Sequence, residues 1–145
     1  MRLIEVKNPQ GIILLAPHFV GTRDYSIEQI AFDIMCWLYE SPDDTYIESL
    51  WSDDNKLMGF FVAYIPEKRK HVFVAQAWLD PQTVHTTWPE DMFDRIKTFA
   101  RLHDLNEIRT ETLKRSLAIS RRWHFEPFST IMTFDLNKEI QNADD

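Results

Sequence analysis

The histidines and the single cysteine are the side chains whose chemistry can be judged first. The five histidines contain no i, i+4 pair and no tight ligand spacing, so we expect no metal site. Cys36 is the only cysteine, which excludes an intramolecular disulfide and a thiolate metal cluster. It stands beside Trp37 on a predicted helix face, where we expect a packed thiol rather than a nucleophile. The histidines are His18, His71, His85, His103 and His124.

Catalytic motifs that depend on glycine are also missing. The chain has three glycines, Gly11, Gly21 and Gly59, and none belongs to a Gly-x-Ser-x-Gly, Gly-x-Gly-x-x-Gly or Gly-Lys-Ser/Thr motif. The sequence therefore argues against a serine hydrolase of that type, a Rossmann dinucleotide enzyme and a P-loop nucleotide-binding protein.

The composition indicates a packed, acidic domain. Of the 145 residues 44% are hydrophobic, which is too apolar a mixture for a disordered chain. The net charge of −7 argues against nucleic-acid binding, and no apolar run approaches the roughly 20 residues of a membrane-spanning helix. We expect one domain over residues 1–136, an acidic and flexible tail over 137–145, and a cytoplasmic location without a signal peptide.

The hydrophobic pattern predicts a series of strands and helices. Period-two alternation and β-branched residues predict strands, whereas apolar side chains at i, i+3, i+4 and i+7 predict helices. Capping-box spacing supports two helix starts, at Ser26 with Gln29 and at Thr87 with Glu90. Strands are expected at 2–7, 45–51, 57–65, 71–79, 107–112 and 128–136, and helices at 11–19, 27–40, 88–103 and 113–123. The run at 11–19 is too short for periodicity to exclude a buried strand, and a short helix is favoured there.

The order of these elements restricts the fold class. The three strands between residues 45 and 79 form an antiparallel meander, and the helix over 88–103 crosses over to a strand that runs parallel to the third. The continuous apolar run at 71–79 predicts a strand covered on both faces. We therefore expect an α/β fold of the mixed α+β kind, with a mixed central sheet and helices on both faces.

The order of elements and one local motif resemble the GNAT (Gcn5-related N-acetyltransferase) superfamily across nearly the whole chain. The stretch over 121–132 resembles the end of the last GNAT helix, its turn and the final strand. The family commonly has leucine, glycine and phenylalanine followed by Glu-Pro there, and Trp123 and His124 replace the first two. The resemblance implies an acyl-CoA N-acyltransferase fold.

A narrower resemblance is to small GNAT-like proteins of tailed bacteriophages. It implies an accessory or virion-associated protein, located in the host cytoplasm or in the virion. The motifs that carry it are Met58-Gly59, Tyr64-Ile65-Pro66 before Lys68-Arg69-Lys70, Ala100-Arg101, and Glu107-Ile108-Arg109-Thr110-Glu111.

The acetyl-CoA loop is where the sequence departs most from this resemblance. GNAT enzymes hold the pyrophosphate with a Gln/Arg-x-x-Gly-x-Gly/Ala loop at the start of the crossover helix, because glycines let backbone N–H groups approach phosphate. The corresponding stretch, 80–89, has no glycine, and Pro89 removes one donor. Asp80, Glu90 and Asp91 add negative charge nearby. We expect a degenerate acetyl-CoA motif.

The contacts to an acyl-CoA are likewise implied by the resemblance. They would fall on Gln76, Trp78 and Leu79 of the third meander strand, and on Arg121 and Arg122 near the phosphates. If the chain binds a cofactor, it is therefore acetyl-CoA or another acyl-CoA.

The catalytic candidates also come from the resemblance. The tyrosine acid of the family falls on Ser120, five residues before His124, and serine is a poor acid. The family's glutamate base has no counterpart in 72–79, so Glu48 or Glu111 on neighbouring strands would have to substitute, although alternating charges on a strand are more often its solvated face.

Two functions remain open from the sequence. The first is a non-catalytic GNAT-like module that needs no cofactor and binds another protein, or a second copy of itself, through exposed aromatic side chains. The alternative is an active N-acyltransferase that transfers an acyl group from an acyl-CoA to an amine.

Overall fold

A mixed seven-stranded sheet forms the centre of the molecule. The computed structural model describes residues 1–111, 122–124, 126–128 and 131–137, and within these the sheet order is β1-β2-β3-β4-β5-β7-β6. All neighbouring strands are antiparallel except β4 and β5, which are parallel. The strands are β1 Arg2–Glu5, β2 Thr45–Trp51, β3 Leu57–Tyr64, β4 Val72–Leu79, β5 Glu107–Glu111, β6 Glu126–Phe128 and β7 Ile131–Asp135.

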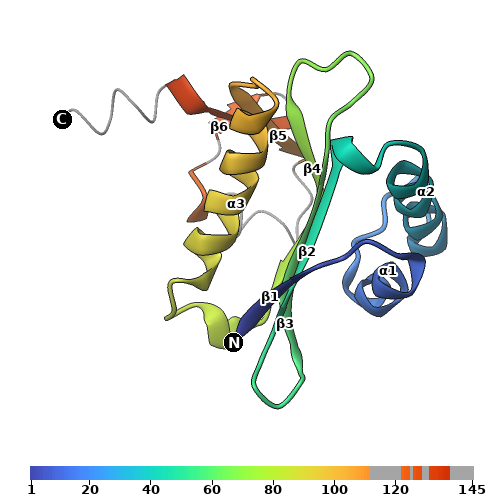
Figure 1. The fold of residues 1–145 in the computed structure, drawn as a ribbon, viewed down its shortest axis with the longest axis vertical. Coiled ribbons are helices and arrows are strands. Elements are labelled where there is room, and N and C mark those ends of the chain that lie inside the picture. Colours follow the sequence, from blue (N-terminus) through green and yellow to red (C-terminus); the bar gives the residue numbers. More distant parts are fainter. Residues whose placement is uncertain (112–121, 125, 129–130, 138–145) are drawn as a thin grey trace.

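Helices cover both faces of the sheet (Figure 1). The crossover helix α3, Trp88–Leu102, lies on one face, and α1, Pro9–Leu15, and α2, Ile27–Glu40, lie on the other. Short 3-10 turns follow α1, precede β2 and follow β4, at Ala16–His18, Pro42–Asp44 and Pro81–Thr83. In the described parts of the chain, no helix has the length and apolar character needed to cross a membrane. The expected mixed α+β architecture is confirmed.

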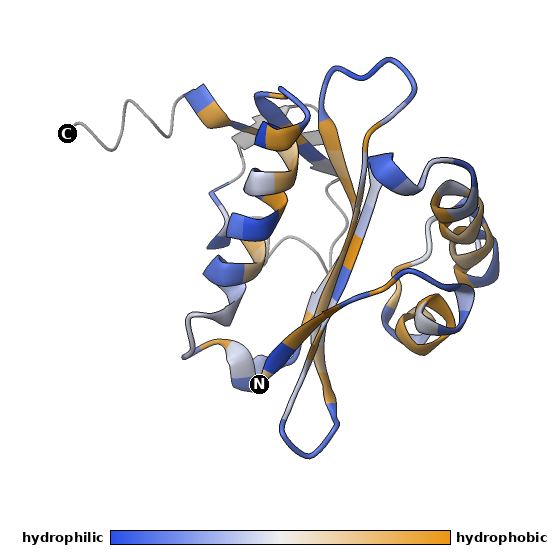
Figure 2. Cartoon of the chain, viewed as in Figure 1, coloured by the Kyte–Doolittle hydropathy of each residue, from blue (hydrophilic) through white to orange (hydrophobic). Residues whose placement is uncertain are grey.

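Two hydrophobic cores form because successive strand residues face opposite sides of the sheet. Leu50, Phe61 and Val74 pack with Ile96 of α3 on one side, whereas Ile47, Phe60 and Val62 pack with α1 and α2 on the other. In Figure 2 the hydrophobic residues of α3 lie on its sheet-facing side and its hydrophilic residues face outward. Strand β4 contributes to both cores, which confirms that it is covered on both faces.

The end of the chain differs from the sequence-based expectation. A single strand over 128–136 was expected, but two antiparallel strands are present, and β6 is the edge strand beside β7. Pro127 stands in the middle of β6, and an edge strand tolerates proline because one side of its backbone needs no partner. The expected helix over 113–123 and the expected tail lie outside the described residues, except at Arg122, Trp123 and Asn137.

The two predicted capping boxes have different outcomes. Ser26 caps α2, because its Oγ accepts the Gln29 N–H at 3.1 Å. Thr87 does not cap α3, and the prediction there is wrong. Its backbone (φ −86°, ψ −2°) is already helical rather than extended, so its hydroxyl donates to Asp91 instead, at 3.2 Å.

The backbone conformation of His124 agrees with the turn that was expected before the last strand. The residue has a φ of 62°, in the left-handed region that glycine adopts without strain. The GNAT resemblance puts the family's glycine at this position. The backbone therefore has the conformation that the family's glycine would suit, although the side chain is histidine.

Candidate functional site

The two parallel strands of the sheet separate along their length. Strand β4 pairs with β5 only from Val72 to Val74, and the described β5 ladder contains no partner for the residues 75–79. A β-bulge at the same point, between the pairs of Val62 with Gln76 and Ala63 with Val74, bends β4. Thr110 closes the paired end by donating its hydroxyl to the Val74 carbonyl at 2.9 Å. Among the described residues, the second half of β4 therefore borders a gap in the sheet.

Gln76 fixes the segment between α1 and α2 against this half of β4. The Val20 N–H donates to Gln76 Oε1 at 2.9 Å, and Gln76 Nε2 donates to the Val20 carbonyl at 3.1 Å. Gln76 is only 7% exposed, so this pair of hydrogen bonds is largely shielded from water. Both ends of the amide thus bind the chain's own backbone.

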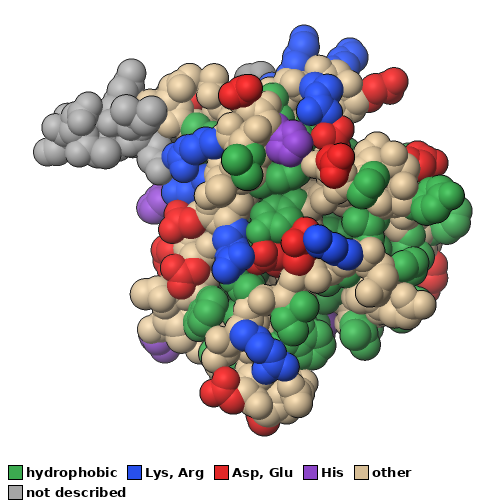
Figure 3. Space-filling model, in the orientation of Figure 1, with side chains coloured by type: hydrophobic (Ala, Val, Ile, Leu, Met, Phe, Trp, Pro, Cys, Tyr) green, Lys and Arg blue, Asp and Glu red, His purple; other side chains and the backbone are tan. Residues whose placement is uncertain are grey.

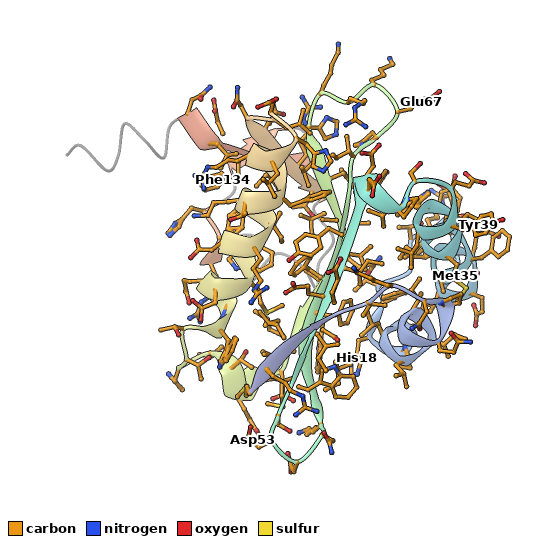
Figure 4. All side chains as sticks on the ribbon, in the orientation of Figure 1. His18, Met35, Tyr39, Asp53, Glu67 and Phe134 are labelled. Atoms are coloured by element: carbon orange, nitrogen blue, oxygen red, sulfur yellow. The ribbon has the colours of Figure 1, made fainter. Side chains whose placement is uncertain are left out.

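Aromatic packing extends the same contact. The His18 ring stacks on Trp78 with centroids 3.9 Å apart, and Phe19 packs edge-on against Phe60. His18, labelled in Figure 4, lies in the short turn after α1 and is held next to the sheet. Leu79, one residue after Trp78, packs instead against the core under α3. The expected acyl-CoA contacts on β4 thus lie on both faces of the strand.

The start of α3 is occupied by Arg122. Its guanidinium donates to both carboxylate oxygens of Glu90, at 2.8 and 3.3 Å, and to the carbonyls of Val84 and Thr86, at 2.7 and 3.2 Å. The hydrogen bond from Arg122 lowers the pKa of the Glu90 carboxyl. This arrangement places a carboxylate and two carbonyl oxygens, all bound to one guanidinium, at the start of α3.

Trp123 completes this contact next to Arg122. The indole is 3% exposed, donates Nε1–H to the Pro89 carbonyl at 2.8 Å and stacks on Phe93. Because the ring fills the space beside the first turn of α3, the segment at 122–124 and the loop before α3 are held as one packed unit.

A second polar group lies under α3, on the opposite face of the sheet from Gln76. Glu48 is 4% exposed, and its Oε1 accepts hydrogen bonds from the Tyr46 hydroxyl at 2.5 Å and from Arg95 Nη1 at 3.0 Å. Its other oxygen, Oε2, is buried without a hydrogen-bond partner among the described residues. Burial, together with the hydrogen bond and charge of Glu48, raises the pKa of Tyr46, so the phenol stays protonated.

Of the three predicted catalytic residues, only Glu111 has its backbone placed beside the gap. Glu48 is on a different face from Gln76, so the sheet separates these two side chains. The backbone of Glu111 ends β5 one residue beyond Thr110, the last residue paired with β4. Ser120 and Arg121 lie outside the described residues. The described chain holds no group of three or more His, Cys, Asp or Glu side chains suited to a metal ion.

Three residues that hydrogen-bond to Glu48 or Gln76 were not predicted from the sequence. Tyr46 precedes Glu48 by two positions, a spacing that puts both on one face of a strand and could have indicated their contact. Arg95 is 47 residues away on α3, and Val20 acts through its backbone. Neither leaves a local pattern, so these two needed the fold.

Comparison with known proteins identifies the fold. The sequence matches no protein-family model and no curated protein. A candidate GNAT-family acetyltransferase from Desulfovibrio desulfuricans has a TM-score of 0.69 and 13% identity, with 93% of this chain and 98% of that chain covered. Tetrahymena Gcn5 gives 0.67 and 9%, covering 94% and 96%. PaiA N-acetyltransferase from Thermoplasma acidophilum, in complex with coenzyme A, gives 0.64 and 14%, covering 93% and 99%. The chain therefore has the GNAT acyl-CoA N-acyltransferase fold.

Proposed function

We propose that this GNAT-fold chain is a non-catalytic accessory protein of a tailed bacteriophage that acts by binding protein, in the host cytoplasm or in the virion. The non-catalytic part of the proposal rests on the hydrogen bonds of Arg122 at the start of α3. Its guanidinium is bound by Glu90 and by two carbonyls of the preceding loop. On this proposal, these groups take the place of the free N–H donors that a pyrophosphate needs.

The charge and geometry of this region oppose a phosphate. An incoming pyrophosphate would have to displace Glu90 from Arg122, and the carbonyls of Val84 and Thr86 would then lose their donors in exchange. Pro89 contributes no N–H, and the Trp88 N–H already donates to the Thr86 hydroxyl at 3.3 Å. The net energetic balance is against ordinary acetyl-CoA binding.

The outer surface of α1 and α2 supports a protein-binding role. Large apolar side chains point to solvent there, and their exposed fractions reach 88% at Tyr39, which Figure 4 shows projecting away from the sheet. Aromatic and aliphatic residues of this kind anchor protein interfaces. Those on the two helices are Ile13, Leu14, Ile27, Phe32 and Tyr39.

Calorimetry with acetyl-CoA and longer acyl-CoAs tests the non-catalytic part. We expect no binding heat at about 1 mM ligand, a concentration at which a dissociation constant of about 1 mM or lower would be detected. The Glu90→Gln variant removes the competing carboxylate but keeps Arg122. It should bind acyl-CoA more strongly than the native chain if the Arg122–Glu90 pair is what blocks the phosphate. Glu28→Gln on α2 is the matched control. Submillimolar binding by the native chain would overturn the proposal.

The phage part of the proposal rests on the four short motifs of the narrower resemblance. Mass spectrometry of purified virions tests it directly, and co-purification with a tagged chain from infected cells tests the accessory role. Recovery in the virion, or with a phage protein from infected cells, supports it. Recovery with neither, at an abundance well above detection, contradicts it.

An acyl-CoA N-acyltransferase is the second candidate, and the gap beside β4 favours it. The backbone of 75–79 has no described β5 partner, so it could bind a pantetheine arm at Gln76, Trp78 and Leu79. Release of free coenzyme A thiol from acetyl-CoA on addition of amine distinguishes the candidates. Substrate-dependent release that is lost in a Glu111→Gln variant would establish this one.

A further inference from the structure

The side of α2 that faces away from the sheet is apolar, and no described part of the chain covers it. Ten of the 14 residues of α2 are apolar, so the helix is hydrophobic on nearly all sides. A helix of that composition is usually buried all round. Here Ala31 and Ile34 are buried against the sheet, whereas Phe32 is 60% exposed. The core accounts for the inner face of α2 but not for the outer one.

The outward apolar residues of α2 form one stripe along the helix. Phe32, Cys36 and Tyr39 stand at i, i+4 and i+7, which places them on one side of the helix. Met35, which is partly covered by the core, borders this stripe. Figure 4 shows Tyr39 projecting away from the sheet. The spacing is the one by which the seam of one helix packs against a second helix.

Helix α1 adds exposed apolar residues on the same side of the molecule. It packs beside α2, and its Ile13 and Leu14 are 58% and 59% exposed. In Figure 3 hydrophobic side chains gather on the side of the molecule that α1 and α2 form. Large apolar side chains that gather in one region of a surface mark an interaction site, whereas isolated ones do not.

The charged residues of this side are mainly acidic. The four polar residues of α2 are three acids, Glu28, Asp33 and Glu40, and one glutamine. Over residues 8–44, which span both helices, the sequence has six Asp or Glu and only one Lys or Arg, which is Arg23. Among the described residues no salt bridge joins the three acids of α2 to a cation. The complementary partner is therefore apolar and basic.

We propose that the outer face of α2 binds an amphipathic helix of a partner protein, whose apolar seam is flanked by lysine or arginine. The seam packs on Phe32 and Tyr39, and the basic side chains pair with Glu28 and Glu40. This inference rests on the proposed function, because protein binding is its premise, and it names the class of partner. A second copy of this chain fits poorly, since the same acids would face each other. An anionic lipid surface is repelled for the same reason.

Fluorescence anisotropy with a synthetic lysine–leucine helix tests this surface. The probe is a labelled peptide of about 21 residues, with Leu at the a and d positions of each heptad and Lys elsewhere. We expect saturable binding with a dissociation constant of about 10 μM. The same peptide with Glu in place of Lys should bind at least about tenfold more weakly, because like charges then meet. No binding of the lysine peptide at about 1 mM chain, or equal binding of both peptides, would overturn the proposal.

Variants of the apolar stripe locate the binding on α2. Phe32→Ala and Tyr39→Ala each remove an exposed ring, so both variants should fold, and each should bind the lysine peptide about tenfold more weakly. The matched control is Leu102→Ala at the end of α3, where the side chain is 78% exposed. It should bind as the native chain does. Native affinity in both α2 variants, or an equal loss in Leu102→Ala, would contradict the site.

Variants of the acids separate local charge from net charge. The double variant Glu28→Gln/Glu40→Gln should bind the lysine peptide about tenfold more weakly. Asp53→Asn/Glu67→Gln removes the same total charge from the two hairpin turns labelled in Figure 4, and should bind nearly as the native chain does. Equal weakening in the two double variants would show that the peptide responds only to net charge, which contradicts the proposal.

Sedimentation tests the other occupants of this surface. The native chain is measured alone and with vesicles of phosphatidylcholine and phosphatidylglycerol, and we expect a monomer that leaves the vesicles unbound. A dimer that Phe32→Ala dissociates would assign the surface to a second copy. Vesicle binding that Phe32→Ala abolishes would assign it to lipid. Either result would overturn the proposal.

The same variants distinguish failure of this inference from failure of the proposed function. A phage protein that co-purifies equally with the native chain, Phe32→Ala and Tyr39→Ala would support the proposed function and remove this site. Peptide binding that depends on Phe32 and Tyr39, with no phage protein recovered, would keep the site and contradict the phage role.

Discussion

Gln76 and Glu48 are two buried polar side chains on neighbouring parts of one sheet, and they face opposite layers of helices. Gln76 is 7% exposed and Glu48 is 4% exposed. The amide of Gln76 has a partner at each end, both supplied by Val20. The carboxylate of Glu48 has two donors on one oxygen and none in the described chain on the other. The two sites are equally buried but differ in how completely they are paired.

This difference separates a fully paired polar residue from an incompletely paired one. A buried polar group whose partners are all internal stabilises the fold and has nothing left to offer a ligand. A buried group with an open acceptor stabilises the fold less, because part of its desolvation is not compensated. The comparison therefore predicts that replacing Gln76 lowers stability more than replacing Glu48 does.

Gln76→Leu should have the largest effect on stability. The substitution keeps the approximate volume but leaves the Val20 N–H and carbonyl without partners in a mostly buried contact, which costs about 2 kcal/mol in free energy of unfolding. Urea unfolding followed by circular dichroism measures it. The control Gln82→Leu, at an exposed position, should change stability by less than about 0.5 kcal/mol. A loss below that threshold for Gln76→Leu would remove the contrast between the two faces.

Tyr46→Phe tests the other face and has a definite dependence on pH. Loss of the hydrogen bond to Glu48 should cost about 1.5 kcal/mol at neutral pH, because the acceptor is charged. Burial and Glu48 raise the pKa of Tyr46 above the ordinary tyrosine value of about 10, so at higher pH the folded state keeps a proton that the unfolded state loses. The contribution is complete below about pH 10 and decreases as the pH rises further.

Urea unfolding of the native chain and of Tyr46→Phe at several pH values between about 7 and about 11 measures this difference. The difference in the free energy of unfolding between the two proteins should become smaller above about pH 10, the ordinary pKa of tyrosine. Tyr25→Phe, where the side chain is 54% exposed, is the control and should show a small, constant gap. A gap that widens with pH would mean that the phenol is not held protonated by its surroundings.

Glu48→Gln should cost about 1 kcal/mol at neutral pH, less than Gln76→Leu, because the Arg95 partner is half-exposed and screened by solvent. The amide oxygen still accepts from Tyr46 and Arg95. Glu5→Gln should be close to neutral, since it removes both the repulsion by Glu48 and a weak contact with Lys7. Urea unfolding measures both. A loss for Glu48→Gln that exceeds the loss for Gln76→Leu would reverse the ranking of the two faces.

Local pattern explains which parts of the fold were predictable. Strand β2 was predicted with its observed bounds, and β3 and β4 to within one residue, because each is a β-branched and aromatic run between turn residues. Strand β6 was missed because three residues around Pro127 carry no strand pattern, and only pairing with β7 makes them a strand.

The sites were harder to predict because their partners are remote or belong to the backbone. Gln76 was singled out, yet its two bonds to Val20 could not be foreseen, since a backbone partner 56 residues away leaves no trace in side-chain type. Glu48 was considered as a base, whereas its contacts with Tyr46 and Arg95 depend on the packing of α3 over β2. Fold class therefore follows from local pattern, and polar pairing follows from tertiary contacts.

His124 differs from Gln76 and Glu48 because its strain lies in the backbone, and its substitution should have a small effect in the stabilising direction. A non-glycine residue at a φ of 62° is strained, and glycine relieves that strain while making the unfolded chain more flexible. The His124→Gly variant should therefore be more stable by about 0.5 kcal/mol. His85→Gly, at an exposed position with an ordinary backbone, should instead lose stability. A loss for both variants would show that the contacts of the His124 ring outweigh its backbone strain.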